Sequence, residues 1–138
     1  AVRIDKLGLA ALTATLLHYL KDEATSTIPI WMMIASSGDE LKRRAARWKR
    51  AIGSDASLVQ GESAIGGGSL PGETLPTWLV ALSAANTTGG AEALAARLRQ
   101  SDPPVMARIQ DDLVVLDPRT VLPEEERALV RVAKGAVE

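Results

Sequence analysis

The chain has 138 residues, with 16 basic and 17 acidic side chains and a formal net charge of −1. This balance excludes a protein that binds nucleic acid through a large net positive charge, and the absence of cysteine excludes disulfides, thiolate catalysis and cysteine-ligated zinc. Hydrophobic residues make up 46% of the sequence, which predicts a folded domain with a substantial core.

Residues 1–55 are predicted to be a helical lead-in. Asp5 is a suitable N-cap for a helix in which leucines recur at helical spacing from Leu9 to Leu20. Periodicity alone allows the apolar segment 28–34 to be a buried strand or a short helix. Pro29 suits the first turn of a helix and favours the helical interpretation.

A third helix has the clearest start in the sequence. Ser37 and Glu40 form a capping box, and Gly53 stands where a helix end favours glycine. One face of this helix is apolar and carries Leu41, Ala45, Trp48 and Ile52. The opposite face is basic and is expected to be solvated, with contact to RNA phosphates as the alternative; its residues are Lys42, Arg43, Arg44, Arg47, Lys49 and Arg50.

Residues 56–138 are predicted to form a β-β-α-β-β-α layer. The expected strands lie at 57–62, 77–83, 105–109 and 113–117, and the expected helices at 91–100 and from 123 to about 133. Asp111 and Asp112 suit the turn of a hairpin, and Pro123 suits a helix start. Short connections between successive strands predict an α+β fold, a small antiparallel or mixed sheet with helices on one face.

A loop rich in glycine and proline, residues 63–76, lies between the first two strands. Its glycines Gly66, Gly67 and Gly68 would let backbone N–H groups approach an anion. The loop matches neither a Walker A nor a dinucleotide-binding loop, because Pro71 and Pro76 prevent a helix from following. A surface loop without a ligand is the alternative interpretation.

The residues taken alone provide no catalytic set. His18 is the only histidine, and one histidine without cysteine defines neither a metal site nor a catalytic triad. The apolar runs are all much shorter than the roughly 20 residues that cross a bilayer. We therefore expect no catalytic residue, no cofactor-binding residue, no metal site and no membrane partner in this chain.

Four stretches resemble, in the same order, passages of the bacterial selenocysteine synthase family, the L-seryl-tRNA(Sec) selenium transferases. They are Arg3-Ile4-Asp5-Lys6 with the leucine-rich run that follows, Ile28-Pro29, the run from Glu62 to Trp78, and the run from Pro103 to Val121. The third and fourth runs, with their GGGSLPGETLP and RIQDDLVVLDPRTV segments, are specific in combination. The resemblance covers nearly the whole chain.

The resemblance implies a fold-type-I enzyme that uses pyridoxal phosphate, of which residues 1–138 are a single C-terminal domain fragment. The fold then corresponds to the C-terminal small domain of such enzymes. The cofactor lysine of the family lies upstream of this stretch, so the fragment is expected to bind no cofactor and to be inactive alone. The full-length enzyme is expected to be a cytoplasmic homo-oligomer.

The family reaction converts seryl-tRNA(Sec) to selenocysteinyl-tRNA(Sec), with selenophosphate as the selenium donor and pyridoxal phosphate as the electron sink. Residue by residue, the resemblance makes Arg3 an arginine that binds an anion at the active site, and Arg108 a second substrate-facing arginine. Gly66, Gly67 and Gly68 match a glycine run that is expected to face the cleft.

Two other functions stay open. One is the C-terminal domain of a related pyridoxal-phosphate lyase that acts on a small phosphorylated amino acid or amino-sugar acid. The other is a non-enzymatic α+β interaction module that uses the basic helix. If the chain is separated from a larger enzyme, it is also expected to expose apolar surface and to self-associate.

Overall fold

The computed structural model describes residues 4–66 and 72–138. These residues form two compact units that divide between Ser36 and Ser37. The expected lead-in of residues 1–55 extends across this division. Helix α4 (Gly38–Ile52) lies in the second unit, because its apolar face packs against the sheet. That residues 1–138 act as one C-terminal domain stays a prediction.

The first unit is helical, as predicted. Its described residues form α1 (Lys6–Leu20), α2 (Ala24–Thr27) and α3 (Pro29–Ala35). Asp5 is the N-cap of α1, since its carboxylate accepts hydrogen bonds from the backbone N–H groups of Leu7 and Gly8. Pro29 occupies the first turn of α3, so the helical interpretation of segment 28–34 is confirmed.

Helix α1 is apolar around its circumference, and none of its residues is buried. Its exposed leucines are Leu7, Leu9, Leu12, Leu16, Leu17 and Leu20. Trp31 of α3 donates a hydrogen bond from Nε1 to the Tyr19 hydroxyl at 2.6 Å, and the two rings meet edge to face with centroids 6.5 Å apart. This contact ties the end of α1 to α3, but it leaves the leucines exposed to solvent.

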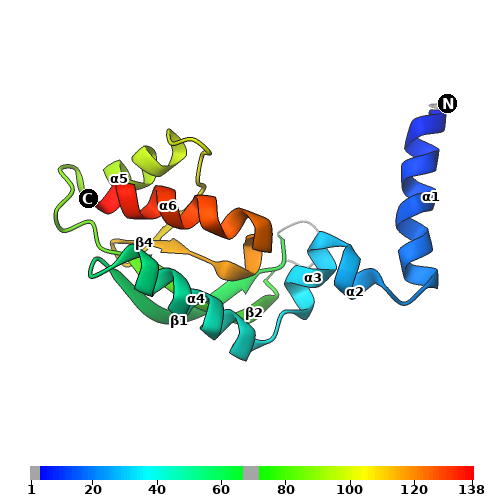
Figure 1. Cartoon of the computed structure of the whole chain (residues 1–138), viewed down its shortest axis with the longest axis horizontal. Helices are drawn as coiled ribbons and strands as arrows, with labels where there is room; N and C mark the ends of the chain where they lie inside the picture. The colour runs from blue at the N-terminus through cyan, green and yellow to red at the C-terminus, as the bar shows by residue number, and fades with distance from the viewer. Residues whose placement is uncertain (1–3, 67–71) are drawn as a thin grey trace. The chain divides into compact units, whose positions relative to one another are not determined.

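The second unit is an α+β layer built on an antiparallel sheet. The strand order is β1-β2-β4-β3, and every pairing in it is antiparallel. The strands are β1 (Ala56–Ala64), β2 (Thr74–Leu82), β3 (Arg108–Gln110) and β4 (Leu113–Leu116). Helices α4, α5 (Gly90–Arg99) and α6 (Glu126–Val137) pack together over this sheet (Figure 1). The predicted fold class is confirmed.

One hydrophobic core joins the three helices to one face of the sheet. The strands contribute Val80, Leu82, Val114 and Leu116. The helices contribute Trp48, Ile52, Leu94, Leu98, Leu129 and Ala133. The apolar face predicted for α4 is the face that is buried, since Leu41, Ala45, Trp48 and Ile52 are all at most 5% exposed.

The opposite face of the sheet has a smaller apolar cluster. Leu79, Ala81 and Val115 are buried there, with Val59 and Leu113 packed against them. Gly61 of β1 makes room for Leu79, because a Cβ at Gly61 would lie 2.5 Å from Leu79 Cδ1. Toward the end of β1 this face becomes polar, and that is where a pocket opens.

The predicted hairpin is present, but its first strand is shorter than predicted. Asp111 and Asp112 form the turn with φ of 51° and 59°, the positive values that a two-residue type I′ turn requires. The predicted strand at 105–109 is wrong before Arg108. The N–H of Val105 donates to the carbonyl of Leu98 at 2.8 Å, so Val105 is hydrogen-bonded to the end of helix α5 and not to β4.

Two short 3₁₀ turns separate β4 from the final helix. The first is η1 (Pro118–Thr120) and the second is η2 (Pro123–Glu125), after which α6 continues to Val137. The carboxylate of Glu125 accepts a hydrogen bond from the Leu122 N–H, as expected for a glutamate at a helix start.

Candidate functional site

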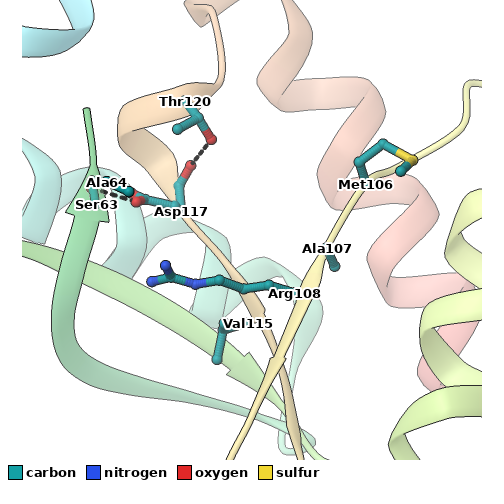
Figure 2. Close-up of a pocket in the computed structure, with 8 residues that line it drawn as sticks. All are labelled: Ser63, Ala64, Met106, Ala107, Arg108, Val115, Asp117 and Thr120. Atoms are coloured by element: carbon teal, nitrogen blue, oxygen red, sulfur yellow. Dashed lines mark hydrogen bonds between the residues drawn. The ribbon is translucent and has the colours of Figure 1, made fainter. Parts of the chain in front are cut away.

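A pocket of about 340 Å³ lies beside the polar end of the sheet. Its lining comes from the end of β1, the segment that leads into β3, and β4 with the turn after it: Ser63, Ala64, Met106, Ala107, Arg108, Val115, Asp117 and Thr120. Figure 2 shows the Arg108 side chain extending across this pocket from β3 toward β1, with Ser63 and Asp117 on the far side. The pocket is therefore lined by one guanidinium, one carboxylate and two hydroxyl groups.

Arg108 is the cation of the pocket. It pairs with Val115 in the sheet register, and its side chain is exposed. Its Nη2 donates to the backbone carbonyl of Glu62 at 2.7 Å. Within residues 4–66 and 72–138 it forms no ion pair. The guanidinium therefore has further N–H donors available to a group in the pocket.

Ser63 and Asp117 line the pocket opposite Arg108, and both belong to a hydrogen-bonded cluster centred on Asp117. Ser63 Oγ donates to Asp117 Oδ2 at 2.5 Å, and Thr77 Oγ1 donates to Asp117 Oδ1 at 3.0 Å. Arg119 donates from Nε to Ser63 Oγ at 3.1 Å and from Nη2 to the carbonyl of Pro76 at 2.7 Å. The cluster therefore joins the end of β1, the start of β2 and the turn after β4.

The three residues that surround the half-buried Asp117 are themselves buried although they are polar. Ser63, Thr77 and Arg119 are at most 5% exposed. Burial lowers the pKa of Arg119, and the charge of Asp117 opposes that shift. Arginine stays protonated even with this lowered pKa, so the Asp117 carboxylate lies in the field of a permanent positive charge. A buried polar cluster of this kind is stable only when its hydrogen bonds are made, which fixes its geometry.

The predicted site residues are distributed unevenly over the structure. Arg108 lines the pocket. Gly66 follows β1 with φ of 125°, in the left-handed region that favours glycine, but it does not line the pocket. Arg3, Gly67 and Gly68 lie outside the described residues. A common site for Arg3, Arg108 and the glycines stays a prediction.

Sequence reasoning missed Ser63 and Asp117, which line the pocket, and Arg119, which donates to Ser63. All three lie within the stretches that resemble the selenium transferases, and that was the only signal available for them. Ser63 and Asp117 are 54 positions apart, so no local spacing rule connects them.

The basic face of α4 differs from the prediction at Arg44, whereas Arg47 is exposed as expected. Arg44 was expected in solvent but is only 7% exposed, because it binds Glu126 and the carbonyl of Val121. Arg47 binds the same Glu126 carboxylate at 3.2 Å. Lys42 lies over the Trp78 ring, 4.5 Å from its centroid. The face is thus partly engaged in contacts within the unit.

The remaining candidates from the sequence are the histidine, a metal site and a membrane-spanning helix. His18 lies on the first unit, with its Nδ1 3.3 Å from Glu23 Oε2. Among the described residues no group of three or more metal-ligating side chains forms. Over the same residues, no helix combines the length and the apolar character that crossing a membrane requires.

No lysine lines the pocket. Its lining includes none of Lys6, Lys21, Lys42, Lys49 and Lys134. An enzyme that uses pyridoxal phosphate needs a lysine to hold the cofactor as a Schiff base. The residues that line this pocket therefore do not fit the cofactor, and Arg108 is the lining residue that suits a group with negative charge.

Comparison with known proteins decides the family. The sequence profile of the L-seryl-tRNA selenium transferases matches residues 1–122. The chain belongs to the L-seryl-tRNA selenium transferase family. The matched residues include the whole pocket and every residue of the Asp117 cluster.

Individual relatives agree with this result. The chain is 43% identical to an L-seryl-tRNA(Sec) selenium transferase of Moorella thermoacetica, over 99% of this chain and 31% of that protein. The corresponding enzyme of Nitratidesulfovibrio vulgaris is 46% identical, over 88% of the chain and 27% of its own length. That of Solidesulfovibrio magneticus is 41% identical, over 99% and 30%. The chain spans about 30% of the length of these selenium transferases.

Proposed function

We propose that this chain is the C-terminal part of an enzyme that converts seryl-tRNA(Sec) to selenocysteinyl-tRNA(Sec) with selenophosphate, and that Arg108 binds a phosphoryl group of one of these substrates. Family membership supports the reaction. The observation that carries the site is the exposed guanidinium of Arg108, which faces a pocket without an ion-pair partner among the described residues.

The chemistry of the reaction favours an arginine at this position. Selenophosphate and the tRNA backbone both carry phosphoryl oxygens, and the planar guanidinium binds two such oxygens at once. One hydrogen bond from Arg108 to Glu62 leaves further N–H groups for the substrate. The pocket residues hold and orient the substrate, while the pyridoxal phosphate that the resemblance implies is held by residues outside this pocket.

Further parts of the proposal rest on the resemblance to the family. Arg3 is a second anion-binding arginine, and Gly66, Gly67 and Gly68 belong to a loop that faces the cleft. The full-length enzyme is a homo-oligomer of the cytoplasm. The chain by itself, which contains no cofactor lysine in the family's sense, is inactive.

The test uses the full-length protein that contains this chain. Arg108→Ala should raise the KM of one substrate by about 10- to 100-fold, because a charge-assisted hydrogen bond contributes about 1.5–3 kcal/mol. Measuring KM separately for selenophosphate and for seryl-tRNA shows which of them carries the bound phosphoryl group. Arg108→Lys, which keeps the charge but loses the fork, should recover only part of the loss.

Arg99→Ala is the matched control. Arg99 is an exposed arginine at the end of α5 in the same unit, and it does not line the pocket. Its removal should leave both KM values within twofold of the wild type. If Arg108→Ala likewise changes neither KM, then Arg108 does not bind substrate.

A further inference from the structure

Two sets of contacts meet at the end of β1. Arg108 donates to the carbonyl of Glu62 at 2.7 Å. One residue further on, Ser63 Oγ donates to Asp117 and accepts from Arg119 Nε. The backbone group that holds Arg108 is therefore directly adjacent to the residue that the Asp117 cluster holds.

We propose that Ser63 is a positioning residue for Arg108. The Asp117–Ser63–Arg119 contacts fix the end of β1, and the Glu62 carbonyl there sets the direction in which the Arg108 guanidinium faces the pocket. The inference rests on the proposed function, because it concerns how Arg108 is aimed at a phosphoryl group.

The strand itself leaves the Glu62 carbonyl dependent on such support. Glu62 is paired with Pro76, and this is a pair at which the two strands exchange no backbone hydrogen bond, since the bonded pairs alternate with it, as between Asp55 and Ser83 or Ile65 and Glu73. The carbonyl of Pro76 is in turn bound by Arg119. Arginine side chains, and not the ladder between β1 and β2, therefore supply hydrogen bonds to the carbonyls of this pair.

A fixed hydrogen-bond acceptor at Glu62 orders the Arg108 side chain before substrate binds. An exposed arginine samples many rotamers, and ordering it on binding costs conformational entropy. A hydrogen bond to a rigid carbonyl orders the side chain before the substrate arrives. Figure 2 shows the arrangement, with the extended Arg108 side chain directed toward the β1 end where Ser63 meets Asp117.

Ser63 and Thr77 provide a matched pair for the experiment. Both hydroxyls donate to Asp117, one to each carboxylate oxygen, and both residues are at most 4% exposed. Thr77 lies on β2 and does not line the pocket, whereas Ser63 adjoins Glu62. The variants Ser63→Ala and Thr77→Val therefore disturb the same carboxylate, but only the first acts on the strand that holds Arg108.

In the full-length protein, Ser63→Ala should raise the KM of the substrate that Arg108 binds at least fivefold, with a change in kcat below twofold. Thr77→Val should leave that KM within twofold, at a similar loss of melting temperature. In the double variant Ser63→Ala/Arg108→Ala, the KM should equal that of Arg108→Ala alone, because Ser63 acts through Arg108. Should Ser63→Ala not fold, Ser63→Cys, which keeps the side chain's shape but is only a weak donor and acceptor, gives the same comparison.

The positioning role would be overturned if Ser63→Ala left the KM unchanged, or if Ser63→Ala and Thr77→Val raised the KM equally. It would also be overturned if the KM increases of Ser63→Ala and Arg108→Ala multiplied in the double variant. A wild-type protein without selenium transfer would instead refute the proposed function. The positioning role would then be judged on inorganic phosphate, whose affinity by calorimetry should fall at least fivefold in Ser63→Ala and stay unchanged in Thr77→Val; equal affinities would refute it.

Discussion

Arg44 of α4 and Glu126 of α6, 82 positions apart in the sequence, form an ion pair with 2.5 Å between Nε and Oε1. Their side chains are 8% and 17% exposed. Arg44 also donates to the carbonyl of Val121 at 2.6 Å, and Arg47 binds the other oxygen of Glu126. The Glu126 carboxylate thus links the start of α6 to α4 at the edge of the core.

Replacing Glu126 by Gln should destabilise the fold by about 2 kcal/mol, because Arg44 would stay buried without its carboxylate. Urea unfolding of the chain, followed by circular dichroism, measures this difference. Lys134→Ala removes the exposed pair with Glu138, whose atoms are 3.9 Å apart, and should cost below about 0.5 kcal/mol. Equal losses in the two variants would contradict a structural role for the Arg44–Glu126 pair.

The same pair makes stability depend on pH. Desolvation raises the pKa of Glu126, but the hydrogen bonds from Arg44 and Arg47 and the charge of Arg44 outweigh it and lower that pKa below its usual value. A carboxyl with a lowered folded-state pKa stabilises the fold above its unfolded pKa of about 4.3. This stabilisation is lost as the pH falls through the folded-state pKa. The difference in urea midpoint between wild type and Glu126→Gln should therefore be constant near neutral pH and shrink in acid.

Two glycines should respond to alanine in opposite directions. Gly135 lies within α6, and a Cβ added there would meet no atom within 4 Å, so Gly135→Ala should stabilise the fold by about 1 kcal/mol through helix propensity. Gly61→Ala would place a Cβ 2.5 Å from Leu79 Cδ1 and should destabilise by about 1–2 kcal/mol. Thermal melting of the two variants gives the signs directly.

The hairpin turn can be improved. Asp111 and Asp112 both adopt positive φ, which Asn-Gly accepts at lower cost. Asp111→Asn with Asp112→Gly should raise stability by about 0.5–1 kcal/mol. Gly53→Ala serves as the opposite test, since φ of 120° at Gly53 disfavours a side chain and the melting temperature should fall.

The leucines of α1 should make the chain self-associate. Leu12 and Leu16 are 48% and 51% exposed on a helix with no buried residue. Sedimentation velocity at rising concentration should show oligomers, and Leu12→Gln/Leu16→Gln should shift the chain toward monomer. Met106→Gln changes an apolar side chain that is 79% exposed on the second unit and should leave the distribution unchanged. A wild-type chain that stays monomeric throughout would contradict this prediction.

The elements that depend on local chemistry were predictable from the sequence. Ser37 caps α4 by accepting from the Glu40 N–H, and Asp111 and Asp112 form the turn, as their residue types indicate. The inward turn of Arg44 was not predictable from helical spacing, because its partner Glu126 becomes a neighbour only when α6 folds back over α4.

The candidate site was predictable only in part. Arg108 was identified through family resemblance, and the structure places it in a pocket. The wall opposite depends on Ser63, Thr77 and Asp117, which come from three different strands or strand ends. Contacts of this kind are set by sheet register and by the twist of β1 and β2, and no pattern within one segment encodes them.

The distribution of tryptophan gives each unit its own optical reporter. Trp31 lies on α3 beside Tyr19 and is 37% exposed, whereas Trp48 is 2% exposed in the core of the second unit. Emission from Trp48 should therefore be blue-shifted and shielded from acrylamide, and emission from Trp31 red-shifted and readily quenched. Since the chain has no phenylalanine and few aromatic residues, a Trp31→Leu variant would follow the unfolding of the second unit through the two tryptophans that it alone contains, Trp48 and Trp78.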